Sequence, residues 1–214
     1  MGFGTALEDR SQVAFLAKEE KLSESDRPGD PREDESLLDA IRAGDVPAFE
    51  RLYELHGARM KSVAANLLGN AADAEDAVQE TFLKVYRGAA AFRGTARIST
   101  WIYRVLVNAC YDMMRRKRRR PVEVAGEPAP GTTEPEFPAP ASDHPLRLSL
   151  EASVKDLEPR RRSAFVLYAV EGFTHREIGE ILGVPEGTSK ALLFEARRDL
   201  QRRLSTAPRR EARP

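Results

Sequence analysis

The chain has 214 residues, of which 41% are hydrophobic, and its 34 basic and 34 acidic residues cancel. A single cysteine, Cys110, excludes an intrachain disulfide framework and fits a reducing cytosol, so we expect a cytoplasmic protein. No stretch approaches the ~18 consecutive apolar residues that a membrane helix needs, and the first residues lack a signal-peptide pattern, so membrane insertion is not expected.

The net charge of zero hides blocks of opposite sign. Residues 1–35 carry five basic and ten acidic residues, residues 36–120 carry 15 and nine, residues 121–144 carry none and five, and residues 145–214 carry 14 and ten. Two basic blocks separated by acidic ones favour two nucleic-acid-facing domains with acidic connecting arms. The length suits two small cores rather than one.

Residues 1–35 are predicted to be a disordered extension, because they mix charges with prolines and contain only one brief apolar patch, residues 13–16. That patch is either a docking element or part of an inert tail. Helices are expected to begin near Ser36.

The stretch from Ser36 to Gly69 is predicted to be helical. The first helix closes around Gly44, Asp45 caps another helix, and Gly69 ends this part of the chain. His56 has no second histidine or cysteine at ligand spacing, so we predict no metal site.

Residues 73–87 predict an amphipathic helix with an acidic outer face, capped by Asp73. Residues at helical spacing form its buried stripe: Ala74, Ala77, Val78, Thr81, Phe82 and Val85. Asp76 and Glu80 repel one another mildly at this spacing, so local helix stability does not explain them, whereas a basic partner surface would. An ordinary solvated helix face is the alternative.

The loop that follows presents an aromatic ring between cations, Phe92 beside Arg93 and Arg97. Such a ring either packs against the protein beneath it or stands ready to stack on a base. The sequence alone leaves both readings open.

A second amphipathic helix is expected from Ser99 or Thr100, which would cap it, to the basic run 115–120. At about 100° per residue, the side opposite its apolar stripe carries a mixed aromatic and polar set. That set is Trp101, Arg104, Asn108, Tyr111 and Arg115. Rings stack on unpaired bases while cations hold phosphates, so the pattern suits single-stranded nucleic acid better than a merely solvated face.

Residues 121–144 contain six prolines and five acids but no basic residue, and are predicted to be a flexible linker. Beyond them, a short helix is expected over residues 146–154, and Pro159 opens the next. A helix capped by Thr174 then leads through a glycine-containing turn to a second helix ending near Arg203. This spacing predicts a DNA-binding helix-turn-helix, with a buried helical hairpin as the alternative.

The second helix of this motif has an apolar side and a polar side. The residues placed inward are Ser189, Leu193, Ala196 and Leu200, and those placed toward a DNA groove are Thr188, Ala191, Glu195, Arg198 and Arg202. A glutamate can accept a hydrogen bond from cytosine but repels phosphate. Glu195 therefore predicts either base reading or weakened affinity.

Both regions resemble the bacterial RNA polymerase sigma factors of the extracytoplasmic-function (ECF) group. The first region does so in DAEDAVQETFLKVYR, FRG, TWIYRVLVN and RRKRRR, and the second in LEP, EIGEILGV, EGT, Lys190 and the pair at 196–197. The resemblance covers roughly residues 36–204. It implies an all-α fold of two small helical domains, 36–120 and 145–204, the second containing the helix-turn-helix. Residues 205–214 are expected to be a disordered tail.

The resemblance implies three partners: core RNA polymerase, promoter DNA and an anti-sigma factor. It implies no catalytic residue, cofactor or small-molecule substrate. The polymerase-binding positions would be Asp73, Asp76, Gln79, Glu80 and Phe82. The minus-10 set would be Phe92, Arg93, Trp101, Arg104, Asn108, Tyr111 and Arg115. The minus-35 set would be Thr174, Thr188, Lys190, Ala191, Phe194, Glu195, Arg198 and Arg202.

This chain departs from the common family pattern at four positions. Ser99, Val107, Leu192 and Glu195 stand where family members often carry arginine. Fewer cations imply weaker phosphate contact. A stand-alone helix-turn-helix regulator that never contacts polymerase is the alternative, and the acidic face of residues 73–80 argues against it.

Overall fold

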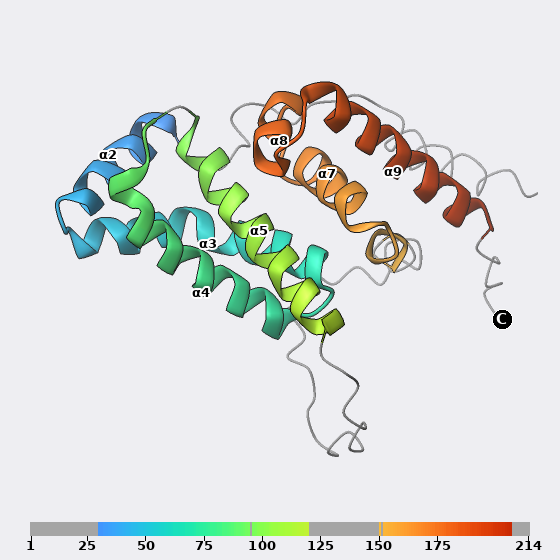
Figure 1. Ribbon diagram of the computed structural model, residues 1–214, viewed down its shortest axis with the longest axis horizontal. Coiled ribbons are helices and arrows are strands. Elements are labelled where there is room, and N and C mark those ends of the chain that lie inside the picture. Colours follow the sequence, from blue (N-terminus) through green and yellow to red (C-terminus); the bar gives the residue numbers. More distant parts are fainter. Residues whose placement is uncertain (1–29, 95, 120–149, 151, 207–214) are drawn as a thin grey trace, which may run out of the picture.

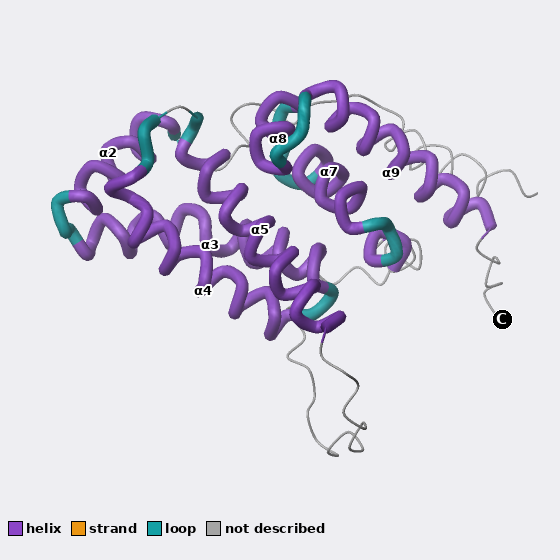
Figure 2. Tube along the Cα trace, viewed as in Figure 1, coloured by secondary structure: helices purple, strands orange, loops and turns teal. Residues whose placement is uncertain are grey.

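The computed structural model describes residues 30–94, 96–119, 150 and 152–206, and every element with assigned bounds is a helix (Figure 1, Figure 2). In chain order these are α2 (Pro31–Arg42), α3 (Val46–Leu68), α4 (Ala71–Gly88), the 3₁₀ turn η2 (Ala89–Ala91), α5 (Ile98–Arg119), α7 (Pro159–Ala169), α8 (His175–Leu182) and α9 (Glu186–Thr206). The all-α prediction is confirmed. The expectations for the linker, and for most of the N-terminal extension and the C-terminal tail, lie outside the described residues.

The first bundle comprises α2 to α5, with α4 packed between α3 and α5 and α2 set against α3, α5 and η2 (Figure 1). The residues predicted for the buried stripe of α4 are all buried. Across α2 and α3, the Asp34 carboxylate lies 2.8 Å from His56 Nε2, and both side chains are excluded from solvent. His56, the histidine considered for a metal, instead joins two helices.

Several helix starts differ from the sequence-based prediction. Helix α2 begins at Pro31, because Asp30 accepts the Arg32 amide at 2.9 Å and proline suits a first helical position. Asn70, not Asp73, caps α4, and its side chain accepts the Asp73 amide at 2.8 Å. Two further boundaries move: α5 starts at Ile98, and α9 runs on to Thr206, into the segment expected to be a tail.

The second bundle comprises α7 to α9 and contains the predicted helix-turn-helix. Thr174 and Glu177 form the expected capping box at the start of α8. Gly179 allows the close approach within the motif, because a Cβ there would lie 2.7 Å from the Val184 carbonyl oxygen. Gly183 ends α8 at a positive φ of 66°. The four residues predicted to face inward from α9 are all buried.

The two bundles pack directly against each other, α5 on α8 and α3 on α7 (Figure 1). Tyr103 is central to this interface: its hydroxyl donates to Glu171 at 2.8 Å and its ring meets Phe173 with centroids 4.9 Å apart. Arg162 of α7 donates to the Leu67 carbonyl at 2.7 Å. No helix in the described ranges is long and apolar enough to cross a membrane.

Candidate nucleic-acid and polymerase interfaces

Two aromatic rings from different segments meet beside the start of α5. The ring of Trp101 lies against that of Phe92, with centroids 4.8 Å apart and planes inclined by 33°, and both residues are half-buried. Gly88 makes room for this pair, because a Cβ there would lie 3.3 Å from the Trp101 ring. We call Phe92 and Trp101 the aromatic platform.

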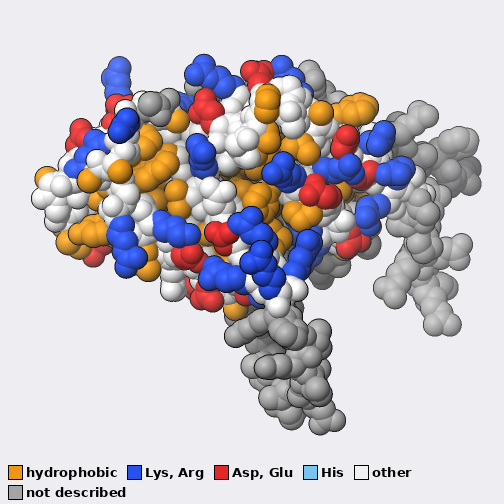
Figure 3. All heavy atoms as spheres, in the orientation of Figure 1, with side chains coloured by type: hydrophobic (Ala, Val, Ile, Leu, Met, Phe, Trp, Pro, Cys, Tyr) orange, Lys and Arg blue, Asp and Glu red, His pale blue; other side chains and the backbone are white. Residues whose placement is uncertain are grey.

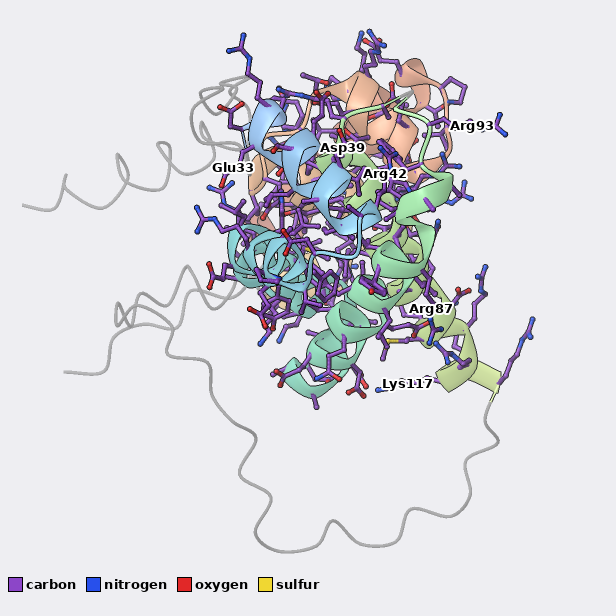
Figure 4. All side chains as sticks on the ribbon, turned by 90° about the vertical axis from the view of Figure 1, so that its left-hand side faces the viewer. Glu33, Asp39, Arg42, Arg87, Arg93 and Lys117 are labelled. Atoms are coloured by element: carbon purple, nitrogen blue, oxygen red, sulfur yellow. The ribbon has the colours of Figure 1, made fainter. Side chains whose placement is uncertain are left out.

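Polar residues predicted for single-strand contact surround the aromatic platform. Arg104 and Asn108 are exposed one turn apart on α5, and Arg93 is exposed on the loop, where its side chain extends away from the bundle (Figure 4). Together they line a groove of about 1210 Å³ whose opposite wall is α8 and the following turn. The structure therefore gathers five of the seven predicted minus-10 residues in one place.

The remaining two residues of that set lie apart. Tyr111 faces the second bundle, where its hydroxyl lies 2.8 Å from the Ser163 hydroxyl, and burial raises the Tyr111 pKa. Arg115 is exposed near the end of α5 and pairs with Asp112. Tyr111 cannot stack on a base while the two bundles are packed together.

The acidic face of α4 is partly occupied by cations of the same chain. Glu80 pairs with Lys84 at 2.7 Å and with Arg116 at 3.2 Å, and the hydrogen bond from Lys84 is the main reason that its pKa is lowered. Asp73 pairs with Lys117; burial opposes the ionised form, but the hydrogen bonds from Lys117 and Asn70 lower its pKa.

The Asp73–Lys117 pair lies where α4 begins and α5 ends, and the pairs of Glu80 lie about two turns further along α4. Figure 3 shows basic and acidic side chains gathered over the part of the surface where α4 begins and α5 ends. Figure 4 shows Lys117 at the corresponding end of the bundle. Asp76 and Gln79 remain exposed, whereas Phe82 is only 3% exposed and packs near Phe49 and Tyr53. Phe82 thus shapes the surface from beneath rather than contacting solvent.

Exposed apolar side chains lie further along α4 and at the start of α3, where the Phe49 ring contacts that of Tyr86. Leu83 and Tyr86 of α4 are 55% and 47% exposed, and Val46 at the start of α3 is 55% exposed. Sequence reasoning did not select Tyr86 as a site residue, although it follows Gln79 at i+7 and therefore shares its side of the helix. Apolar groups beside carboxylates are typical of a protein-binding surface.

Most of the predicted minus-35 residues are exposed on α9: Thr188, Lys190, Ala191, Phe194, Arg198 and Arg202. Phe194 is 67% exposed. Lys190 pairs with Glu186 at 2.7 Å, and Thr174 serves the capping box.

Glu195 has a partner that the sequence did not indicate. Arg161 of α7 lies 2.8 Å from the Glu195 carboxylate and 2.6 Å from that of Asp199. Asp199 also pairs with Arg202. The Glu195 charge is therefore balanced inside the domain, and a base contact would have to replace Arg161.

Within the described residues, no group of three or more histidine, cysteine or carboxylate side chains could hold a metal ion. Cys110 is buried in the first bundle, and burial raises its pKa to about 12. The thiol is thus protonated and screened from reagents at neutral pH.

Each bundle matches a different region of the same protein family. Residues 52–120 match Sigma-70 region 2, and residues 147–200 match Sigma-70, region 4. The first match contains the aromatic platform and the acidic face of α4, and the second contains the helix-turn-helix. The protein is thus of the sigma-70 class of transcription initiation factors.

Relatives narrow the class further. The ECF RNA polymerase sigma factor SigM of Mycobacterium tuberculosis (strain ATCC 25618 / H37Rv) is 32% identical over 177 residues, 81% of this chain and 85% of that protein. The ECF RNA polymerase sigma factor SigE of Mycolicibacterium smegmatis is 33% identical over 195 residues, 87% of this chain and 74% of that protein. The chain belongs to the ECF RNA polymerase sigma factors.

Solved structures share the fold. CnrH, in complex with the cytosolic domain of CnrY, superimposes with a TM-score of 0.62 at 21% identity, covering 82% of this chain and 99% of CnrH. The sigma factor RpoE, in complex with the anti-sigma factor NepR from Bartonella quintana, gives 0.61 at 24% identity, covering 76% and 99%.

Proposed function

We propose that the chain binds core RNA polymerase and directs it to promoters by reading two DNA elements in different states. The second bundle reads the minus-35 element as duplex through α9, and the first reads the minus-10 element as melted strand. The aromatic platform beside Arg104 and Asn108 carries this proposal, because half-exposed rings flanked by polar groups suit unpaired bases. Binding of duplex alone would need only α9. No catalytic step is involved, and the protein acts in the cytoplasm with the polymerase.

Reconstitution with core polymerase tests the proposal. The chain should co-elute with core enzyme and produce defined transcript starts from a template library with a randomised upstream region, whereas core enzyme alone should not. A chain that never co-elutes with core but retards duplex DNA by itself would be the stand-alone regulator instead.

An anti-sigma partner is part of the proposed function. CnrH was solved in complex with the cytosolic domain of CnrY, and RpoE in complex with an anti-sigma factor. By extension, this chain is held inactive by a protein of that kind until it is released to polymerase.

Asp76 offers the cleanest test of the polymerase-binding surface. It is exposed, and unlike Asp73 and Glu80 it has no ion pair among the interactions described for the chain. Asp76→Lys should weaken core binding roughly tenfold or more, because a like charge would face a basic polymerase surface. Glu35→Lys makes the same charge reversal on α2 and should leave core binding and helical circular dichroism unchanged. Equal core affinity of both variants would contradict the assignment.

The pairing of Arg161 makes the role of Glu195 testable. Arg161→Ala should weaken holoenzyme binding to duplex roughly threefold to tenfold, because it exposes the Glu195 and Asp199 carboxylates to phosphates. Arg160→Ala removes the same charge at the neighbouring position and should cost less. Glu195→Gln added to Arg161→Ala should recover part of the loss.

Anisotropy titrations at several salt concentrations, with a duplex pool of randomised sequence, measure these effects. Equal losses for the Arg161 and Arg160 variants would show that only net charge matters. Lost base preference in Glu195→Gln alone, read by sequencing the bound pool, would show that the carboxylate leaves Arg161 to read a base.

A further inference from the structure

The last residue of α2 is bonded to the loop that carries Phe92. Arg42 donates from Nε to the Ala89 carbonyl at 2.9 Å and from a terminal nitrogen to the Phe92 carbonyl. Its other terminal nitrogen lies 2.7 Å from Asp39, one turn earlier on the same helix. Figure 4 shows Asp39 and Arg42 together on α2, on the side of the bundle from which Arg93 also projects. One guanidinium thus joins α2 to both ends of the η2 turn.

The η2 turn has few stabilising interactions of its own. η2 consists of three alanines, which offer no polar side chains, and its closing bond runs from the Phe92 amide to the Ala89 carbonyl at 3.3 Å. Phe92 then adopts an extended conformation and leads to Gly94, which has a φ of 70°. The Arg42 contacts supply charge-assisted hydrogen bonds, which are stronger than neutral ones.

Fixing the Phe92 backbone also fixes its ring. The ring lies on Trp101, whose position is set by α5, while Gly88 leaves the space that the indole needs. The platform therefore has one ring on a rigid helix and one on a turn that is tied to a different helix. Arg42 itself is about one third exposed and does not line the groove beside the aromatic platform.

We propose that Arg42 is a positioning residue for the minus-10 site, holding Phe92 against Trp101 so that the two rings meet a flipped or unstacked base as one surface. The consequence for DNA rests on the proposed function, whereas the fixing of the loop is a property of the chain by itself. The geometry requires arginine, because a lysine ammonium cannot direct two hydrogen bonds and an ion pair from one rigid plane.

Tryptophan fluorescence reads the loop directly, because Trp101 is the only tryptophan in the chain. In the full-length protein, Arg42→Ala and Arg42→Lys should both red-shift the emission and raise acrylamide quenching roughly twofold, since the Phe92 ring no longer covers the indole. Arg51→Ala is the matched control: Arg51 is exposed on α3, pairs with Glu33 and Glu54, and should leave the emission unchanged.

The same variants are then compared in the reconstituted holoenzyme. Both Arg42 variants should form roughly tenfold fewer open complexes, the loss expected when charge-assisted hydrogen bonds disappear, while duplex binding through α9 stays at the level of the Arg51 variant. Arg42→Lys retains the positive charge. If it forms as few open complexes as Arg42→Ala, the loss is due to the missing hydrogen-bond geometry of the guanidinium and not to the missing charge.

Unchanged quenching in a folded Arg42→Ala protein would overturn the proposal. So would full rescue by Arg42→Lys, which would assign the effect to charge alone. If quenching increased but open complexes formed normally, Arg42 would still hold the loop in place. The role of the aromatic platform in the proposed function would then be refuted.

Discussion

Trp101→Ala should reduce open-complex formation by the holoenzyme roughly 5-fold to 150-fold, because stacking of one base on an aromatic ring is worth about 1–3 kcal/mol. The substitution should weaken the capture of the melted strand and not the initial binding of duplex, because duplex is bound through α9, which is unchanged. Permanganate footprinting of unpaired thymines measures open complexes, and a gel-shift assay on closed duplex measures the first step.

Trp101→Phe provides the control for this prediction. It keeps a ring against Phe92 and should retain most of the open complexes. If Trp101→Ala instead lowered the unfolding midpoint but transcribed normally from duplex templates, the ring would be part of the core and not a base contact.

Glu171→Lys should separate the two bundles. Glu171 is 3% exposed and accepts the Tyr103 hydroxyl at 2.8 Å, so lysine would place an ammonium group in a buried site near Arg59. An unpaired buried charge costs several kcal/mol, which is enough to reverse the packing of two small domains. The distance between fluorophores on α2 and α9 should increase, and Tyr111 should lose its contact with Ser163.

Asp156→Lys is the matched control for that separation. It reverses a charge within the second bundle at the exposed pair with Arg203 and leaves the hydrogen bond between Tyr103 and Glu171 in place. The inter-fluorophore distance should stay at the wild-type value. A Glu171→Lys protein with the wild-type distance would show that the interface is held by its other contacts.

The packing of the two bundles should also depend on pH, because Glu171 is buried at their interface. Burial raises its pKa above the ordinary value of 4.5, although the Tyr103 hydrogen bond and the charges of Arg59 and His56 oppose the rise. Because the packed state binds the proton more tightly, its extra stability is fully present below about pH 4.5 and is lost as pH rises through the raised pKa. Glu171→Gln should abolish this dependence. If the distance between the fluorophores on α2 and α9 of the wild-type protein did not change as the pH rises above about 4.5, protonation of Glu171 would not stabilise the packing of the bundles.

The features that the sequence predicts well are those set by local repetition. Helical spacing alone identifies the buried stripe of α4 and the inward side of α9, because each position depends only on its angle around one helix. The Thr174–Glu177 capping box depends on residues three apart and is equally readable. These regularities predict both bundles and the exposure of most residues proposed for binding.

Contacts between distant positions could not be predicted in this way. Tyr111 sits on the expected face of α5, yet it contacts a hydroxyl 52 residues away in the second bundle. Glu195 sits toward the expected groove, yet Arg161 of another helix pairs with it. The position of a residue around its helix determines the direction of its side chain, and the sequence shows this position. The residue that the side chain then contacts depends on how separate helices pack against each other.

The ion pairs between α4 and α5 give the two proposed binding surfaces a shared set of charges. Asp73 and Glu80 hold Lys117 and Arg116, which belong to the basic run that would otherwise meet phosphate. A polymerase surface that takes the carboxylates must displace these cations, and phosphates that take the cations leave the carboxylates unpaired. Each ligand removes the internal competitor of the other, so linkage requires the two binding equilibria to be positively coupled by one reciprocal factor. Until one of the two ligands binds, these internal ion pairs neutralise part of the charge on both surfaces.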